Sequence, residues 1–163
     1  MVNKIFPEVK VFEANMFRDF RGDIWTTYKK TTTPLKVEFI HDKYSSSRQN
    51  VIRGIHGDHK TWKLVSCIHG EIYFVVVDNR PESKTYLKWD WMMLDDRDRR
   101  QVLIPPGFGN GFCVMSKEAV FSYKLAYENE YSDVDQQFTL KWNDERVMID
   151  WPTNNPILQA RDK

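Results

Sequence analysis

The chain carries no marked excess of charge of either sign, since 24 lysines and arginines stand against 23 aspartates and glutamates. A net charge of +1 creates no overall field that would draw the protein to nucleic acid or to an anionic membrane. No apolar run is long enough to span a bilayer. We therefore exclude nucleic acid and membrane as partners. Any anionic ligand must be held by a local cluster of arginines and lysines.

Cysteine is scarce, and no leader segment is recognisable. Cys67 and Cys113 each lie in a strand-like run, so we expect two buried free thiols in a reducing compartment, with a disulfide between them as the alternative. Residues 1–6 lack the apolar stretch and the small-residue cleavage site of a signal peptide. These features predict a cytoplasmic protein.

Helix signals are also few, and only residues 8–16 and a turn near 143–146 are candidates. Short apolar or alternating runs recur instead, with proline, glycine or polar residues at the breaks: 37–40, 63–69, 71–78, 86–94, 102–105, 112–115 and 119–127. This spacing is typical of a sandwich or barrel. The run at 71–78 has apolar residues at both alternating sets of positions, which predicts a strand buried on both faces.

No linker or internal repeat divides the chain, so we expect one all-β domain over residues 1–163. An all-β domain of this size has sheet edges to cover. Six tryptophans also suggest more apolar surface than one barrel needs. These two features favour a homodimer.

The histidines do not have the pattern of a metal site. Jelly-roll metal enzymes usually present a His-x-His pair on one strand, whereas residues 53–59 read RGIHGDH and place His56 and His59 three apart, on opposite faces of a strand. A second element, PPGFGN at 105–110, has Asn110 where a further ligand would stand, and asparagine is a poor ligand for transition metals. We predict a site without metal.

His56 then needs another explanation, and its neighbours suggest one. Arg53 precedes it by three residues, Lys63 follows by seven, and Gly54 and Gly57 allow close approach to a ligand. Cations beside an imidazole can bind an anion and stabilise a developing oxyanion. A lone structural histidine is the alternative interpretation.

Two further segments have the composition of a ligand site. The run FRDFRG at 17–22 joins Arg18 and Arg21 to aromatic side chains, which suits a diphosphate with a stacked base or sugar, although a solvated turn would look the same. Tyr123 stands in an otherwise apolar run, where a buried hydroxyl needs a partner. Tyr123 is otherwise simply a core aromatic residue.

These segments belong to a series of blocks along the chain: FRDFRG at 17–22, Ser45 and Ser47, VIRGIH at 51–56, KLV at 63–65, IPPGF at 104–108, YK at 123–124 and IDWP at 149–152. In this order they resemble the dTDP-4-dehydrorhamnose 3,5-epimerase family of the cupin superfamily, over nearly the whole chain. The resemblance implies a jelly-roll fold and a carbohydrate epimerase that needs no cofactor. The implied substrate is a nucleotide-diphosphate 4-keto sugar.

The resemblance also implies roles for individual residues. His56 stands where the family has its general base, and Asp162 stands where an aspartate orients that histidine. Lys63 matches the lysine that faces the sugar C4 oxygen, and Tyr123 matches the acid on the opposite face. The implied substrate contacts are Phe17, Arg18, Arg21, Lys43, Ser45, Arg53 and Asn110.

These roles suit the chemistry of a carbon beside a ketone. Removing its proton gives an enolate, and histidine titrates near neutral pH as such a base should. A carboxylate on the other ring nitrogen would fix the tautomer, and an ammonium group would stabilise the enolate oxygen. Inversion then requires a proton donor on the opposite face of the sugar.

Several positions depart from the rhamnose-pathway pattern. Thr26 replaces a frequent glutamate, Asn110 replaces a histidine, and Asn129 replaces a second tyrosine. The changed blocks look like epimerases of GDP-linked 4-keto heptoses used for capsule polysaccharides, so we expect that substrate. The alternatives are a dTDP-4-dehydrorhamnose 3,5-epimerase, a sugar-nucleotide 3,4-ketoisomerase and a non-catalytic sugar-binding cupin.

Overall fold

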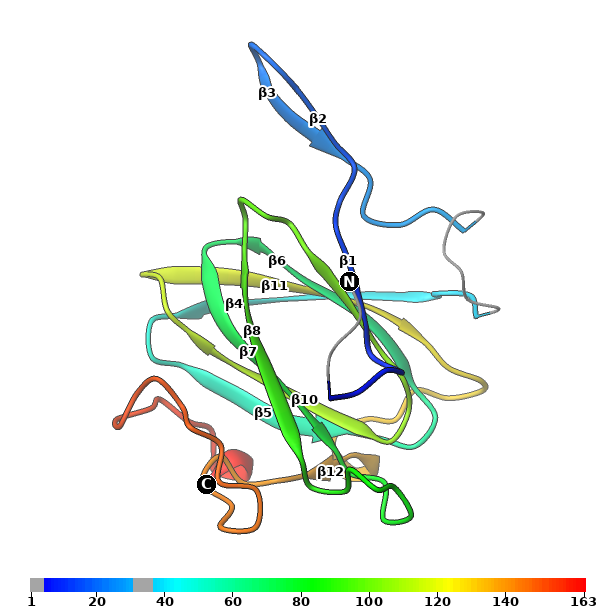
Figure 1. Cartoon of the computed structure of the whole chain (residues 1–163), viewed down its shortest axis with the longest axis vertical. Coiled ribbons are helices and arrows are strands. Elements are labelled where there is room, and N and C mark those ends of the chain that lie inside the picture. Colours follow the sequence, from blue (N-terminus) through cyan, green and yellow to red (C-terminus); the bar gives the residue numbers. More distant parts are fainter. Residues whose placement is uncertain (1–4, 31–36) are drawn as a thin grey trace.

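The computed structural model describes residues 5–30 and 37–163. Two antiparallel five-stranded sheets face each other in a sandwich (Figure 1). The first sheet has the order β1 (Lys10–Phe12), β9 (Gln101–Ile104), β6 (Trp62–His69), β11 (Glu118–Ala126) and β4 (His41–Arg48). The second has the order β12 (Phe138–Thr139), β5 (Ile52–Gly57), β10 (Phe108–Val114), β7 (Glu71–Asp78) and β8 (Trp89–Asp95). The predicted all-β class is confirmed.

Two apolar clusters hold the sandwich together. The larger lies between the sheets and includes Phe121, whose ring contacts those of Phe74 and Phe112. The smaller lies on the outer face of the second sheet, where Leu140, Val147 and Trp151 of the C-terminal segment cover it. Strand β7 is therefore buried on both faces, as its sequence predicted.

Three of the elements expected from sequence are not formed. Residues 8–16 form no helix, because β1 occupies residues 10–12 and pairs with β9. Residues 37–40 are not a strand, and the strand begins at His41 instead. Residues 143–146 form a turn and no helix.

The buried free thiols Cys67 and Cys113 are confirmed, and burial raises the pKa of Cys67 to about 12.

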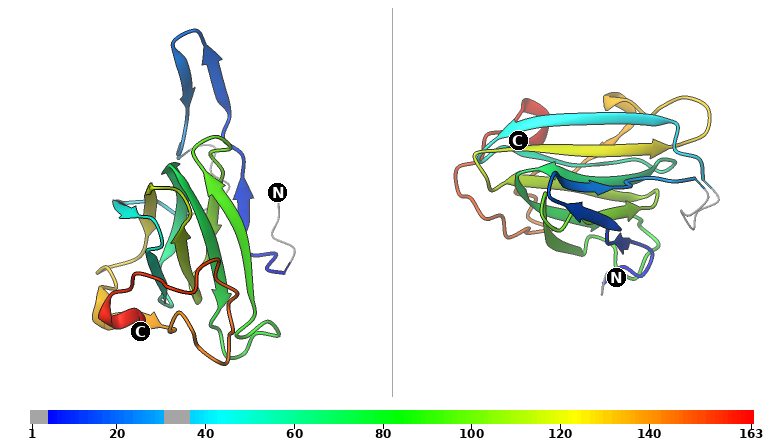
Figure 2. Two further views of the ribbon diagram at one scale, coloured as in Figure 1. Left: turned by 90° about the vertical axis from the view of Figure 1, so that its left-hand side faces the viewer. Right: turned by 90° about the horizontal axis from the view of Figure 1, so that it is seen from above.

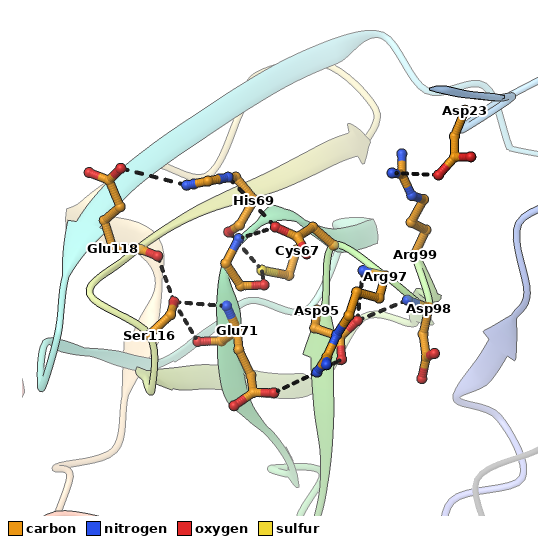
Figure 3. Close-up of polar contacts among 12 residues, drawn as sticks. Asp23, Cys67, His69, Glu71, Asp95, Arg97, Asp98, Arg99, Ser116 and Glu118 are labelled. Atoms are coloured by element: carbon orange, nitrogen blue, oxygen red, sulfur yellow. Dashed lines mark hydrogen bonds and ion pairs between the residues drawn. The ribbon is translucent and has the colours of Figure 1, made fainter. Parts of the chain in front are cut away.

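A hairpin of β2 (Met16–Asp19) and β3 (Gly22–Trp25), which we call the arm, projects from the sandwich (Figures 1 and 2). Neither strand pairs with the five-stranded sheets. Several of its apolar side chains are exposed, among them Phe17, Ile24 and Phe20, which is 98% exposed. Arg99, in the loop after β8, pairs with Asp23 of the arm (Figure 3).

Two short 3-10 helices complete the chain, η1 (Val134–Gln136) and η2 (Ala160–Asp162). Over residues 5–30 and 37–163, no helix has the length and apolar character needed to cross a membrane. Residues 1–4, which belong to the N-terminal segment considered for a signal peptide, lie outside the described residues.

Candidate functional site

A cavity of about 190 Å³ opens between the two sheets at one end of the sandwich. Polar and charged side chains from five strands line it, together with the segment around η1 and the C-terminal η2. The lining residues are Lys43, Arg53, His56, Lys63, Asn110, Phe112, Phe121, Tyr123, Leu125, Tyr131, Asp133, Val134, Gln137, Gln159 and Arg161.

A bulge in β5 explains how Arg53 and His56 both reach this cavity. Residues three apart on a regular strand face opposite sides. Here His56 pairs with Asn110 and Arg53 pairs with Phe112, so three steps on β5 match two on β10. The extra residue turns both side chains to the same face. Gly54 permits this, because it has a φ of +108° and a Cβ there would lie 2.6 Å from the Asn110 carbonyl oxygen.

The His56 imidazole is paired with a buried carboxylate. Its Nε2 lies 2.6 Å from Oδ1 of Asp162, which is fully buried in η2. The backbone holds η2 in place, since the Trp142 N–H donates to the Asp162 carbonyl at 3.1 Å. The predicted partnership of these two residues is therefore present, and the chain end is pinned. With Nε2–H donating to Asp162, Nδ1 is left as the basic nitrogen of His56.

Lys63 reaches the same region from β6, on the opposite sheet. Its ammonium donates to the His56 carbonyl at 3.1 Å and to Oδ1 of Asn110 at 3.0 Å. An ammonium group has three hydrogens, so one remains for a ligand. Burial lowers the pKa of Lys63 to about 8, against the opposing effect of Asp58, and Arg161 lowers it further. Lys63 is thus a cation poised to lose its charge in mildly basic solution.

Tyr123 lies on β11, beside Lys63 in the first sheet, whereas His56 lies on β5 in the second sheet. A ligand between the sheets would meet the imidazole from one wall and the phenol from the other. Tyr123 packs edge-to-face on Phe121, with ring centroids 5.1 Å apart, and this contact orients the ring. Tyr123 thus lines the cavity and also packs against the core.

Three further cations, Lys43, Arg53 and Arg161, and the aromatic residue Tyr131 also line the cavity. Arg53 donates to Ser47 at 2.8 Å, and Lys43 lies 4.7 Å from the centre of the Tyr131 ring. Sequence reasoning missed Tyr131 and Arg161. Arg161 adjoins Asp162, which was a usable signal. Tyr131 lies in a segment without strand or helix periodicity, so only the fold brings it to the cavity.

The structure does not bring every predicted contact to the cavity. Phe17, Arg18 and Arg21 lie on the arm and do not line it. Arg18 pairs with Asp23 and Arg21 pairs with Asp19, so neighbouring carboxylates compensate both charges. Ser45 also lies outside the lining, and its hydroxyl is buried with no hydrogen-bond partner among the described residues.

His59 does not line the cavity with His56, but the predicted placement on opposite faces of one strand is not what separates them, because His59 lies beyond the end of β5. Strand β5 ends at Gly57, and the His59 ring lies 5.5 Å from Phe138 and lines a different cavity with Trp62 and Tyr127. Among residues 5–30 and 37–163, no three histidine, cysteine or acidic side chains are grouped so that they could hold a metal ion.

Sequence comparisons with known proteins point to one family of enzymes. The sequence model of the family described as dTDP-4-dehydrorhamnose 3,5-epimerase matches residues 3–163. The dTDP-4-dehydrorhamnose 3,5-epimerase of Shigella flexneri is 39% identical over 96% of this chain and 88% of its own. The dTDP-4-dehydrorhamnose 3-epimerase of Streptomyces niveus is 38% identical over 73% of this chain and 58% of its own.

A solved structure supports the same assignment. The dTDP-6-deoxy-D-glucose-3,5-epimerase of Legionella pneumophila, in complex with dTDP-4-keto-L-rhamnose, superposes with a TM-score of 0.91. It is 31% identical and covers 99% of this chain and 88% of that one. The predicted cupin fold is thereby confirmed. The chain belongs to the dTDP-4-dehydrorhamnose 3,5-epimerase family, and it is a carbohydrate epimerase.

Proposed function

We propose that this protein inverts a carbon beside the ketone of a nucleotide-linked 4-keto sugar by removing a proton on one face and returning one on the other. The observation that carries this proposal is the contact at 2.6 Å between His56, on β5 of the second sheet, and Asp162 of η2, with Tyr123 and Lys63 on the first sheet. His56 and Tyr123 line the same cavity from different sheets, so that one can act as base and the other as acid on opposite sides of the sugar.

The proposed reaction uses each group once. His56 Nδ1 takes the carbon-bound proton while the electron pair of that bond moves toward the ketone oxygen. Asp162 stabilises the imidazolium, and the free hydrogen of Lys63 meets the enolate oxygen. The Tyr123 hydroxyl then protonates the carbon from the other side, and solvent restores both groups. Substrate and product have the same oxidation state, so the reaction consumes no electrons.

For the substrate we favour a dTDP-linked 4-keto-6-deoxyhexose. The relatives support this choice, since they are named for dTDP-4-dehydrorhamnose and the Legionella structure holds dTDP-4-keto-L-rhamnose. The sequence-based expectation of a GDP-linked heptose receives no support from them. It stays a second candidate because Asn110, in contact with Lys63, stands where the family pattern has histidine.

Which carbon is inverted follows from how the sugar lies between the sheets. Both C3 and C5 flank the ketone, and the named activities of the relatives include both a 3,5-epimerase and a 3-epimerase. A fixed base and a fixed acid act on whichever carbon the sugar presents between them. We therefore propose inversion at C3, C5 or both, to be read from the product.

We also propose a homodimer in which the arm completes the site of a second copy. The arm projects away from its own sandwich (Figure 2) and exposes Phe17 at 64%, Phe20 at 98% and Ile24 at 69%. Apolar side chains exposed to this extent on a projecting hairpin favour burial against a partner. Such burial would bring Phe17, Arg18 and Arg21 to a cavity that they do not line in their own chain.

The test is product analysis in deuterated water with a panel of dTDP- and GDP-linked 4-keto sugars. Deuterium at C3 or C5, with the ketone still at C4, is the expected result. A 3-keto product would identify a ketoisomerase. Binding without isotope exchange would identify a non-catalytic sugar-binding protein. The nucleotide and sugar that exchange fastest decide between the dTDP-hexose and GDP-heptose proposals.

A second histidine variant controls for any general effect of losing an imidazole. His56→Ala should abolish exchange. His69→Ala should not, because His69 lies between Asp96 and Glu118, at 3.6 Å from each and outside the cavity lining (Figure 3). Equal activity of the two variants would contradict the proposed role of His56.

A further inference from the structure

The arm has little backbone support from the sandwich. Within residues 5–30 and 37–163, strands β2 and β3 pair only with each other. A two-stranded hairpin is marginal in water without further packing. Its direction must therefore be fixed largely by side-chain contacts at its base.

Arg99 makes two such contacts with β3. Its guanidinium carbon lies 3.5 Å from the centre of the Trp25 ring, and its Nη2 lies 3.3 Å from Oδ2 of Asp23 (Figure 3). Asp23 in turn accepts two hydrogen bonds from Arg18, at 2.6 and 3.1 Å. One side chain of the sandwich thus reaches both an aromatic ring and a carboxylate of the arm, and through Asp23 it is linked to Arg18.

The loop that carries Arg99 is itself well fixed. Oδ1 of Asp95 accepts from the backbone N–H groups of Arg97 and Asp98, each at 2.8 Å, and its carbonyl accepts from the Arg99 N–H at 3.2 Å. Two residues after Arg99, Gln101 pairs with Phe12, just before the chain leaves for the arm. The loop therefore stands at the base of the arm.

Arg99 differs from the nearby Arg97 in burial and in its partners. The Arg99 side chain is 18% exposed, whereas Arg97 is 76% exposed and pairs with Glu71 and Asp95, not with the arm. A planar guanidinium can stack on an indole and pair with a carboxylate at the same time, which an ammonium group cannot do. Arg99 therefore connects the sandwich to the arm through two contacts made by one side chain.

We infer that Arg99 is a positioning residue that sets the direction of the arm and thereby the placement of Phe17, Arg18 and Arg21 in the cavity of a second copy. This inference rests on the proposed exchange of arms in a homodimer. It predicts that loss of Arg99 harms the site of the partner and not the site of its own chain.

The experiment uses mixed dimers. One chain carries His56→Ala, with an intact arm, and the other carries Arg18→Ala with Arg21→Ala, with an intact cavity. Different tags allow co-expressed mixed dimers to be purified. Each dimer then has one complete site, so about half of the wild-type exchange rate should return.

Arg99→Ala is then placed on either chain. On the His56→Ala chain, which supplies the working arm, it should reduce the recovered rate by about tenfold or more, since a misplacement of 1 Å can cost more than that. On the chain that supplies the working cavity it should leave the recovered rate unchanged. Arg97→Ala is the matched control and should change neither mixture. Arg99→Lys should restore part of the rate.

The outcomes separate the inference from the function on which it rests. If the mixed dimer without an Arg99 substitution recovers no exchange activity, the proposed exchange of arms is wrong, and the inference about Arg99 fails with it. If recovery occurs but Arg99→Ala acts equally on both chains, or on neither, the positioning role is wrong. Should Arg99→Ala fail to fold, Trp25→Leu and Asp23→Asn remove the same contacts from the arm side and must give the same one-sided loss.

Discussion

At the scale of single residues, the cavity is built from side chains that short sequence blocks already point to. His56, Lys63, Asn110 and Tyr123 lie in such blocks, and the structure brings them to one cavity. Asp162 lies far away in sequence yet reaches His56 at 2.6 Å. Tyr131 escaped prediction because its segment has no pattern that marks a site, and Arg161 was missed although it adjoins Asp162.

The Asp162 carboxylate gives the first prediction. Asp162→Asn keeps the shape of the side chain but removes the charge that favours the imidazolium. We expect kcat to fall by about 10²–10⁴-fold with a smaller change in KM, the size typical of lost general-base assistance. Steady-state kinetics checks this. Asp96→Asn, next to the exposed His69, is the control, and equal kcat values for both variants would contradict the role.

The second prediction concerns pH and Lys63. Burial lowers its pKa to about 8, so the ammonium form is present below that pH and is lost above it. Because the proposed reaction needs the ammonium, activity should fall as pH rises through about 8. Asn110→Asp would add a negative charge at the group 3.0 Å away and should move this fall to higher pH. A fall that does not move, or moves lower, would exclude Lys63 as its source.

At the scale of elements, the bulge of β5 decides which side chains face the cavity. Gly54→Ala should lower the free energy of unfolding by about 3 kcal/mol, because the new Cβ would meet backbone atoms of β10 and the left-handed conformation would be strained. Gly22→Ala is the contrast, since Gly22 has a φ of +126° but nothing within 4 Å. It should cost only about 1–2 kcal/mol. Urea denaturation measures both, and equal losses would contradict the steric argument.

Most strands were predictable from sequence, and the failures have physical reasons. Strands β6, β7, β9 and β11 are apolar on at least one face, so their periodicity is visible. Strand β4 is a polar strand at a sheet edge, and its serines hide it. The start of β10 is glycine-rich because a Cβ at Gly109 would lie 2.5 Å from Ile55. The arm was interpreted from sequence as a cationic cluster, because the sequence does not show that Arg18 and Arg21 pair with Asp23 and Asp19. Its strands also contribute nothing to the core, so they lack a clear apolar periodicity.

At the scale of the whole molecule, the arm gives the protein an apolar surface that one chain leaves uncovered. Phe20→Ser should weaken a homodimer by about tenfold or more in Kd, since exposed aromatic anchors dominate such contacts. Met148→Ser, at a residue 74% exposed elsewhere, should not. Sedimentation over a range of concentrations measures both. A wild-type monomer at micromolar concentration would contradict the dimer.

The proposed function depends on removal of a carbon-bound proton by His56, which can be followed directly. Purified protein and a dTDP-linked 4-keto-6-deoxyhexose are incubated in deuterated water, and the sugar is followed by NMR. The wild-type protein should introduce deuterium at a carbon beside the ketone and invert that carbon, and His56→Ala should do neither. Wash-in at the wild-type rate without the His56 imidazole would contradict the account.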